Sequence, residues 1–381
     1  PGNEGDFPAE DFFHTFLEQA VCFFTEETNY RSSLSPFGIK MVDRLTGKPL
    51  NLDISDLPLK MGWTTNRNKF VIGPSGSGKS FFMNHLIRGY YEQGAHVLIV
   101  DTGNSYLGLC EMINRKTHGE DGIYFTYTTE NPITFNPFYV EDGMFDIEKK
   151  ESIKTLILTL WKRENEIPTR AEEVALSNAL NSYIARITND KGVRPCFDTF
   201  YEFVRDDYRE ELISKRVREK DFDIHGFLNI LQPYYHGGEY DYLLNSDKEM
   251  DLLNKRLIIF ELDSIKDHKI LFPITTIIIM ETFINKMRKL PGVRKLILIE
   301  EAWKAIASAN MADYIKYLYK TVRKHFGEAI TVTQEIEDII SSPIVKESII
   351  NNSDCKILLD QRKYVNKFDS VQNLLGLSEK E

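Results

Sequence analysis

The residues with the most recognisable chemistry form a glycine-rich segment that reads GPSGSGKS and matches the pattern GxxxxGK[ST]. Glycines let successive backbone N–H groups turn inward, and a helix that starts at the end of the segment adds a positive partial charge, so the segment attracts phosphate. We expect Lys79 to contact the β- and γ-phosphates of a nucleotide, and the Ser80 hydroxyl to bind Mg²⁺. The predicted phosphate-binding residues are Gly73, Pro74, Ser75, Gly76, Ser77, Gly78, Lys79 and Ser80.

Two adjacent acidic residues supply the groups that such a loop needs opposite it. Glu300 and Glu301 follow the apolar run LILI at once, which places them at the end of a predicted neighbouring buried strand. We expect Glu300 to bind Mg²⁺, directly or through water, and Glu301 to orient the attacking water. The alternative is the start of a surface helix, because acidic residues favour helix N-termini. A rival acidic site, Glu261 or Asp263 after the run LIIF, lacks adjacent paired acids.

Three further polar residues are candidates for contact with the γ-phosphate. Gln334 ends the run AITVT, and its amide lies beside Glu301 if the two strands are neighbours. Arg323, late in the preceding predicted helix, is a candidate arginine finger toward an adjacent subunit, and we expect it to face outward from the active edge of the sheet. Basic residues also favour helix C-termini, which is the alternative explanation. Arg362, just after the last predicted strand, is a second candidate for the same role.

The sequence favours ATP over GTP as the nucleotide. Residues 366–369 spell NKFD, which matches the guanine-reading motif NKxD, but that motif should directly follow a buried strand and here DQRKYV intervenes. The eight histidines form no cluster of ligands, and we interpret residues 236–239 (HGGE) as a loop. The four cysteines lie far apart without a CxxC pair, which argues against a zinc site and suits a reducing compartment.

The phosphate-binding loop requires a strand before it and a helix after it, and the sequence predicts both. Strands over residues 69–72 and 96–100 with a helix over 79–92 form a βαβ unit of the size found in parallel sheets. Further apolar runs predict strands over 256–262, 295–299, 329–333 and 356–359, and helices over 270–289, 302–325 and 343–352. The predicted fold class is therefore α/β with a mainly parallel sheet.

A change in the sequence pattern in the middle of the chain predicts an inserted subdomain. Between residues 141 and 255 strand-like runs give way to charged helical stretches over 146–163, 170–187 and 199–218. We interpret 141–255 as an inserted all-α subdomain, and 61–140 with 256–381 as the nucleotide-binding core. Residues 1–60 form a lead-in, with an amphipathic helix over 10–28 and short strands around a Gly-Lys-Pro turn. Because the chain opens at Pro1 without methionine, we expect this lead-in to be the remnant of a larger N-terminal region.

Composition narrows the classes of partner. The chain has 381 residues and a formal net charge of −10, so it does not sheathe nucleic acid with its whole surface, although DNA contact through local basic loops stays open. The longest apolar stretch, 270–280, is too short to span a bilayer and contains Pro273, which predicts a buried helix. The first residues carry no signal peptide, and we expect a cytoplasmic protein.

Between Phe70 and Leu359 the sequence resembles the TraG-type ATPases of conjugative transposons. These are relatives of the large cytoplasmic (VirB-type) ATPase of type IV secretion, within the HerA/FtsK superfamily. The phrases that carry the resemblance are VIGPSGSGKSFFMNHLI, VLIVDTGNSY, NPITFNPF, LILIEEAW, TVRKHFG and TVTQEIEDI. The EAW after one apolar strand and the TQ that ends the next are more specific than the phosphate-binding loop, which thousands of proteins share.

The resemblance implies a RecA-like P-loop core, an inserted all-α domain and assembly into a hexamer or a smaller oligomer. It also implies that ATP hydrolysis supplies energy for pilus biogenesis and substrate transfer, with other type IV secretion components as partners and a peripheral location at the inner membrane. One departure is the family's usual Asp-Glu pair, which reads Glu300-Glu301 here. Because Glu is one methylene longer than Asp, the metal contact can be mediated by water.

Several functions remain open on the sequence alone. The leading hypothesis is an oligomeric motor ATPase of a DNA-transfer secretion system. A DNA-pumping translocase is the first alternative, and it should show DNA-stimulated hydrolysis and salt-sensitive binding. An ATP-dependent scaffold with little hydrolysis is the second, against which the paired Glu300 and Glu301 argue. A small-molecule kinase is the last, and the large helical insertion and the missing Arg-rich lid segment argue against it.

Overall fold

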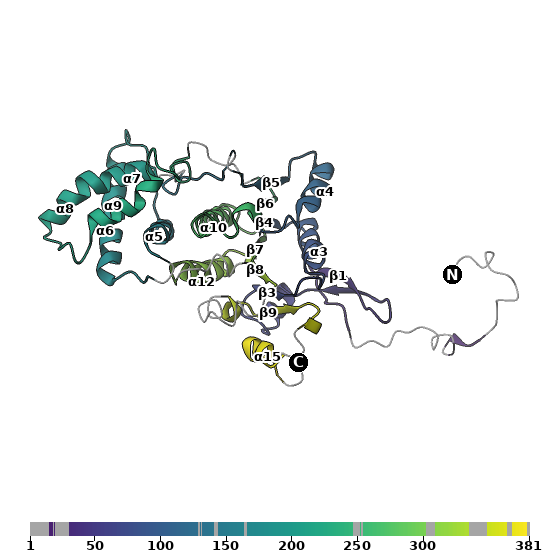
Figure 1. The fold of residues 1–381 in the computed structure, drawn as a ribbon. Coiled ribbons are helices and arrows are strands. Elements are labelled where there is room, and N and C mark those ends of the chain that lie inside the picture. The colour runs from purple at the N-terminus through teal and green to yellow at the C-terminus, as the bar shows by residue number, and fades with distance from the viewer. Residues whose placement is uncertain are drawn as a thin grey trace.

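The computed structural model describes residues 15–17, 19, 30–128, 130, 132–140, 144–163, 166–246, 252, 254–301, 309–334, 349–363 and 368–378. Its centre is a seven-stranded sheet in which all strands run parallel, in the order β5-β6-β4-β7-β8-β3-β9 (Figure 1). The strands are β3 (Lys69–Ile72), β4 (His96–Asp101), β5 (Gly122–Thr126), β6 (Leu257–Glu261), β7 (Lys295–Glu300), β8 (Gly327–Thr333) and β9 (Cys355–Leu358). The predicted α/β class with a parallel sheet is confirmed.

Helices cover both faces of the sheet, as parallel strands require. Every residue of β3, β6, β7 and β8 is buried, and β6 and β7 accordingly contain continuous apolar runs rather than alternating patterns. Helices α3 (Lys79–Glu92) and α4 (Leu107–Thr117) lie on one face, and α10 (Leu271–Lys289) and α12 (Ala309–Lys324) lie on the other (Figure 1).

Helix α10 contains the longest apolar stretch of the chain. Fifteen of its nineteen residues are buried, so the prediction of a buried helix here is confirmed. A helix that is apolar on all sides is typical of the interior of a protein. In the part of the chain that the structure describes, no helix combines the length and the apolar character needed to cross a membrane.

The described residues between 144 and 246 contain helices and no strand. These helices are α5 (Ile147–Trp161), α6 (Arg170–Asn189), α7 (Phe197–Phe203), a π-helical turn (Val204–Tyr208), α8 (Arg209–Ser214), α9 (Ile224–Leu231) and a 3₁₀ turn (Gln232–Tyr234). Local sequence sets the helix starts: Thr169 and Glu172 form a reciprocal capping box at α6. The helix predicted over 199–218 ends earlier, at Ser214, because Arg216 adopts a left-handed conformation (φ 55°).

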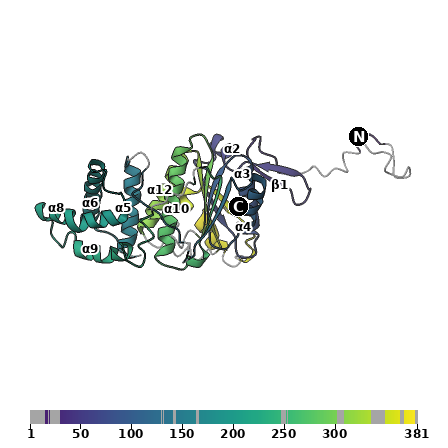
Figure 2. The same ribbon diagram turned by 90° about the horizontal axis from the view of Figure 1, so that it is seen from above.

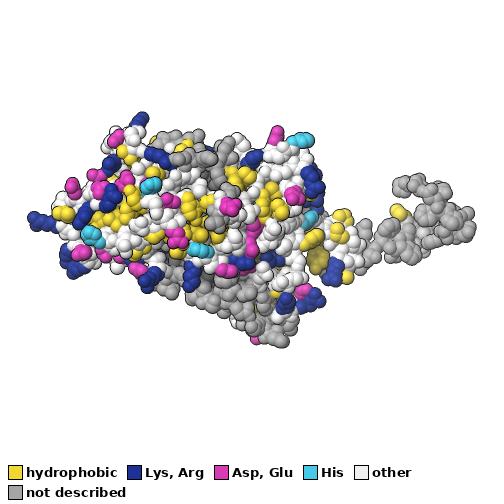
Figure 3. Space-filling model, turned by 45° about the horizontal axis from the view of Figure 1, so that its top comes forward, with side chains coloured by type: hydrophobic (Ala, Val, Ile, Leu, Met, Phe, Trp, Pro, Cys, Tyr) yellow, Lys and Arg dark blue, Asp and Glu magenta, His cyan; other side chains and the backbone are white. Residues whose placement is uncertain are grey.

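Charged side chains of both signs are mixed over the surface of this helical region, as Figure 3 shows for one face. Neighbouring charges pair with each other, for example Arg205 with Asp206 and Arg218 with Asp221. Exposed pairs of this kind contribute little to stability. They are therefore solvated helix surfaces, in agreement with the mixed charges in the sequence.

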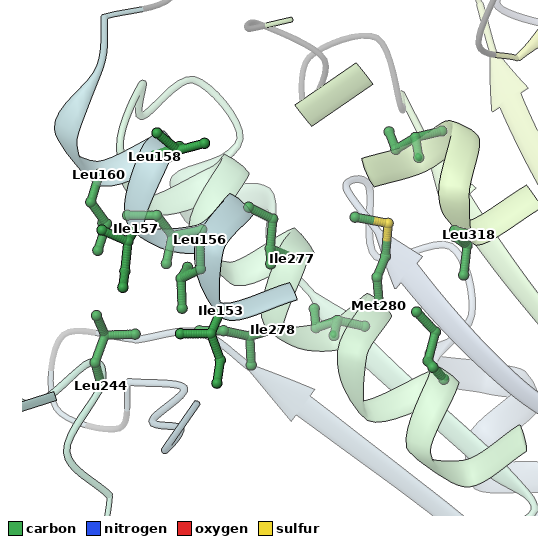
Figure 4. Close-up of a cluster of buried hydrophobic side chains, with 14 of the residues drawn as sticks. Ile153, Leu156, Ile157, Leu158, Leu160, Leu244, Ile277, Ile278, Met280 and Leu318 are labelled. Atoms are coloured by element: carbon green, nitrogen blue, oxygen red, sulfur yellow. The ribbon is translucent and has the colours of Figure 1, made fainter. Parts of the chain in front are cut away.

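Helix α5 joins the helical region to the sheet-covering helices by a shared apolar core (Figure 4). Ile153 and Ile157 of α5 and Ile277 and Met280 of α10 are all at most 1% exposed. Lys149 of α5 also forms an ion pair with a buried carboxylate of α10. Figure 2 shows α6, α8 and α9 beyond α5, on the side away from the sheet.

A cluster of buried charges lies at the amino ends of the strands, opposite the edge where the phosphate-binding loop starts. Lys69, the first residue of β3, and Arg294, just before β7, both pair with Glu328 of β8. Ser55 accepts a hydrogen bond from Lys69 Nζ (2.8 Å), and its hydroxyl oxygen lies 2.8 Å from the Tyr90 hydroxyl oxygen. Each charge in the cluster has a partner of opposite sign, as burial requires.

The lead-in contains an antiparallel pair of short strands, β1 (Ile39–Val42) and β2 (Pro49–Leu52), followed by α2 (Asp56–Lys60). The predicted short strands are confirmed. The helix predicted over 10–28 lies almost wholly outside the described residues. The same is true of residues 302–308 and 343–348, which belong to two other predicted helices.

Candidate functional site

The loop from 73 to 80 joins β3 to α3, which is the context that its sequence pattern requires. No side chain fits at Gly73, because a Cβ atom there would lie 2.5 Å from Ser77 Oγ and 3.1 Å from Leu359 Cβ. Gly76 and Gly78 both have φ of 85°, a conformation that side chains disfavour. Gly73 is therefore required by the lack of space and Gly76 and Gly78 by their backbone conformation, and together the three glycines shape a backbone cradle at the N-terminus of α3.

The expected carboxylate lies opposite this cradle. Strand β8 separates β3 from β7, so the acidic strand is the second neighbour of the loop strand rather than the adjacent one. Even so, Glu300 at the end of β7 reaches the loop: its Oε2 lies 3.8 Å from Lys79 Nζ. Both side chains are less than 10% exposed, which strengthens their mutual attraction.

Glu301 follows β7 in a left-handed backbone conformation with φ of 50°. Its backbone N–H donates a 2.9 Å hydrogen bond to the Val332 carbonyl oxygen of β8, and the residue is 9% exposed. A residue other than glycine rarely adopts this conformation, and such positions are enriched at functional sites. The structure thus turns the chain sharply at the second acidic residue of the pair.

Gln334 directly follows β8, between the two halves of the site. The preceding residue, Thr333, pairs with Ile72 of β3, and its carbonyl oxygen accepts a hydrogen bond from the Gly73 N–H (3.2 Å). On the other side, Val332 pairs with Glu300. The expectation that the Gln334 strand neighbours the Glu301 strand is confirmed.

Arg323 lies at the opposite edge of the sheet from the phosphate-binding loop. It is exposed near the end of α12, four residues before β8 begins. Because β8 has seven residues, its two ends lie roughly 20 Å apart at the usual rise of a strand. The expectation that Arg323 faces outward from the active edge is wrong, since α12 runs back across the sheet before the chain enters β8.

The second arginine candidate does lie at the edge of the loop. Gln361 donates a hydrogen bond to the Ile72 carbonyl (3.2 Å), and Lys363 donates one to the Ser75 carbonyl (2.8 Å), so the segment after β9 contacts the phosphate-binding loop. Between them, exposed Arg362 directs its Nε toward both carboxylate oxygens of Asp360 at 2.9 Å. Its guanidinium is therefore held by that acid.

No role was predicted for the loop between β4 and α4, but the structure brings it to the site. Ser105 Oγ lies 3.3 Å from Ser80 Oγ, and the buried Tyr106 hydroxyl donates a 2.7 Å hydrogen bond to Glu300 Oε1. Burial, followed by the neighbouring Glu300 charge, raises the pKa of Tyr106 well above its usual value, so this phenol keeps its proton. The signals in the sequence were a Gly- and Asn-containing turn after a buried strand and the phrase VLIVDTGNSY, which carries part of the family resemblance.

Asp101, the last residue of β4, supports this loop. Its carboxylate accepts hydrogen bonds from the backbone N–H groups of Gly103 (3.2 Å) and Ser105 (2.7 Å). Burial, with the nearby Glu300 and Glu261 charges, raises the pKa of Asp101 to about 8. Three carboxyl groups from adjacent strands thus share one region of the sheet edge.

The rival acidic site is occupied by structural contacts. Glu261 accepts hydrogen bonds from the backbone N–H groups of Asn104 (2.9 Å) and Asp263 (2.9 Å) and lies on β6, with β4 between it and β7. Asp263 pairs with Lys266. These two acids therefore lie farther along the sheet from the loop strand than Glu300 does.

The residues at this edge fit a nucleotide held with Mg²⁺. Ser80 and Glu300 offer hydroxyl and carboxylate oxygens, the ligand type that Mg²⁺ prefers. Ser77 Oγ is buried in the cradle and makes no hydrogen bond to any described residue. Among the described residues, no group of three or more His, Cys, Asp or Glu side chains is arranged to hold a metal ion. Mg²⁺ is commonly bound by one or two protein groups and completed by substrate phosphates and water.

Comparison with known proteins shows the family of this chain. Residues 38–381 match the family model described as TraG P-loop domain. Protein TraC of Escherichia coli strain K12 is 26% identical over 305 residues, which cover 78% of this chain and 32% of TraC. The type IV secretion system protein VirB4 of Bartonella quintana strain Toulouse is 23% identical over 359 residues, which cover 92% of this chain and 41% of that protein.

A solved structure shares the fold. VirB4 of Thermoanaerobacter pseudethanolicus matches with a TM-score of 0.66 at 19% identity, over 91% of this chain and 90% of that one. The RecA-like P-loop fold that the resemblance implies is confirmed. The chain spans less than half the length of the two curated relatives.

Proposed function

Because the chain belongs to the TraG P-loop domain family, we propose that it binds ATP with Mg²⁺ and hydrolyses the bond to the γ-phosphate. The observation that carries the proposal is the buried pair of Lys79 and Glu300, whose Nζ and Oε2 atoms lie 3.8 Å apart where the loop meets the end of β7. A cation for the phosphates and a carboxylate for the metal are the charges that an ATP–Mg²⁺ site requires.

Binding follows from the cradle and its flanking groups. Backbone N–H groups of the loop and the N-terminus of α3 hold the phosphate oxygens, and Lys79 neutralises the β- and γ-phosphates. Ser80 and Glu300 would hold Mg²⁺, which would offset the charge that develops on the transferring phosphoryl group. Burial of Lys79 and Glu300 excludes water and makes each of these interactions stronger than at the surface.

Hydrolysis requires a positioned water and an acceptor for its proton. Glu301 follows Glu300 where the backbone turns away from β7, and its carboxylate accepts the proton of the attacking water. The water oxygen bonds to the γ-phosphorus while the bond from that phosphorus to the bridging oxygen breaks, and the electron pair leaves with ADP. Gln334, on the neighbouring strand tip, contacts the γ-phosphate through its amide.

The position of Arg323 restricts the role that it can have at a nucleotide site. It lies roughly 20 Å along the sheet from the site of its own chain, so it can act on phosphate only in another subunit. We therefore propose a homo-oligomer, a hexamer by the family resemblance, in which Arg323 contributes positive charge to the neighbouring site. Arg362 is the alternative, and it would first have to leave Asp360.

At the level of the cell, we propose a motor of a conjugation or type IV secretion system. One relative is named as a type IV secretion system protein. The role would be to power pilus biogenesis and the transfer of DNA or protein, together with other secretion components, from the cytoplasmic side of the inner membrane. The chain spans 32% to 41% of the length of these two curated relatives. We therefore propose this role for a whole protein that contains such a domain, and not for the domain by itself.

The test is the rate of ATP hydrolysis at increasing protein concentration, with and without single- and double-stranded DNA. A rate that rises more steeply than the protein concentration supports the oligomeric motor. Stimulation by DNA that disappears with added salt would favour a DNA-pumping translocase instead. ATP binding without turnover at any concentration would contradict the motor and leave an ATP-dependent scaffold.

A further inference from the structure

The loop between β4 and α4 contacts both residues that the proposed function assigns to Mg²⁺, although they lie on different elements. Ser105 Oγ lies 3.3 Å from Ser80 Oγ at the start of α3. The next residue, Tyr106, donates its hydroxyl hydrogen to Glu300 Oε1 over 2.7 Å. Two consecutive residues of one loop thus reach a hydroxyl and a carboxylate that the chain separates by more than 200 residues.

Hydrogen bonds to three neighbouring elements fix this loop. Asp101 accepts the Ser105 N–H (2.7 Å), and Glu261 accepts the N–H of Asn104 (2.9 Å). On the opposite side, the Asn84 amide of α3 donates to the Ser105 carbonyl oxygen (3.0 Å). The loop is therefore held by two strands and by the helix that carries Ser80.

The Tyr106 contact sets the orientation of Glu300. An ionised carboxylate only accepts hydrogen bonds, so the phenol is the donor. Tyr106 is 0% exposed, which leaves no room for water to replace it. With Oε1 held by Tyr106, the other oxygen, Oε2, is the one that lies 3.8 Å from Lys79 Nζ. The hydrogen bond thus opposes rotation of the carboxylate away from the loop.

We infer that Ser105 and Tyr106 are positioning residues of the nucleotide site, which orient Ser80 and Glu300 for Mg²⁺, and that Tyr106 makes the larger contribution. The inference rests on the proposed function, since it needs Ser80 and Glu300 to hold the metal. Removing a partner that orients a metal ligand typically lowers metal affinity or activity about 10- to 100-fold. Tyr106 should lie in that range because its acceptor is charged and buried.

The experiment uses Tyr106→Phe in the full 381-residue chain. ADP binding is measured by calorimetry over a series of Mg²⁺ concentrations, and the rise in melting temperature caused by ADP is measured with and without Mg²⁺. We expect the Mg²⁺ concentration at half-maximal effect to rise about 10-fold or more. ADP affinity without metal should stay within about twofold, because the cradle and Lys79 are unchanged.

Ser105 provides a second route should Tyr106→Phe fail to fold. Ser105→Ala should shift the Mg²⁺ midpoint in the same direction by a smaller factor. Ser105→Thr keeps the hydroxyl and should return the midpoint to the wild-type value. A Ser105→Ala chain with the wild-type midpoint would contradict the role of this residue.

Tyr90→Phe is the matched control. Tyr90 is also 0% exposed, and its hydroxyl lies 2.8 Å from Ser55 Oγ in the cluster at the opposite edge of the sheet. It should lower the melting temperature without moving the Mg²⁺ midpoint. If Tyr106→Phe leaves the Mg²⁺ midpoint unchanged, as Tyr90→Phe should, while nucleotide binding by the wild type depends on Mg²⁺, this inference is overturned and the proposed function is not. A wild-type chain whose nucleotide binding ignores Mg²⁺ would overturn the proposed function and this inference together.

Discussion

Replacing Glu301 with glutamine keeps the length and nearly the volume of the side chain while removing its capacity to accept a proton. Turnover of ATP should then fall about 10²- to 10⁴-fold. At about 1.36 kcal/mol for each factor of ten, this corresponds to roughly 2.7 to 5.4 kcal/mol of activation free energy. ATP affinity should change less than about twofold, because Lys79 and Glu300 keep their 3.8 Å contact.

The backbone at this position allows a companion variant. Glu301 has φ of 50°, and the left-handed conformation costs a residue with a Cβ atom about 1 to 2 kcal/mol. Glycine relieves that strain but loses about 0.5 to 1 kcal/mol more backbone entropy on folding. Glu301→Gly should therefore be as slow in hydrolysis as Glu301→Gln, with a melting temperature equal to the wild type or a few degrees higher.

Single-turnover hydrolysis of ATP, equilibrium binding and thermal melting of both variants check this reasoning. Glu300→Gln is the matched control, and it should weaken Mg²⁺-dependent binding. If Glu301→Gln loses binding and turnover equally, and Glu300→Gln is the milder hydrolysis variant, the two roles must be exchanged. Native turnover in Glu301→Gln would refute a catalytic role altogether.

Three further variants test other parts of the structure. Lys79→Ala should abolish ATP hydrolysis, and native turnover in this variant would contradict the site assignment. Lys363→Ala is the control: it removes an exposed cation at the same loop and should leave most of the hydrolysis rate. Arg323→Ala should keep its ATP affinity and lose roughly 10³-fold or more in turnover. Mixing it with Lys79→Ala should restore part of the ATPase activity. A mixture that assembles but stays inactive excludes Arg323 as the arginine finger. Burial and three nearby cations lower the pKa of His96 from its usual 6.5 to about 4, so between these values the unfolded chain binds more protons. The free energy of unfolding should therefore fall as the pH drops from 6.5 to 4, by at most about 1.4 kcal/mol per unit, and the melting temperature of His96→Asn should depend less on pH in this range.

The strands and the loop that hold the site were predictable because their signals are local. A strand buried on both faces is usually rich in apolar residues, and β3, β6, β7 and β8 were found from such segments within one or two residues. Strand β5, an edge strand with one fully buried residue, was not predicted. Helix α4, which follows the Ser105 turn, was missed with it.

The order of the strands was not predictable from local patterns. The sequence placed Glu300 next to the loop strand, whereas β8 lies between them. Contacts across the sheet depend on this order: Tyr106 and Glu300 are 194 residues apart, and no spacing rule connects them. Arg323 was assigned to the wrong edge for the same reason, since its place depends on the direction in which α12 crosses the sheet.

The apolar core shared by α5, α10 and α12 limits how the chain can be shortened. A domain that is inserted in the sequence is often assumed to be separable, so that cutting it out leaves an intact catalytic unit. Here, excision of residues 147–246 would uncover one side of α10, a helix with fifteen buried residues out of nineteen. It would also leave the buried carboxylate of Glu281 without its ion-pair partner Lys149. Such a surface favours aggregation. For recombinant expression, the helical insertion and the sheet should therefore be treated as one folding unit, with any boundaries chosen outside both.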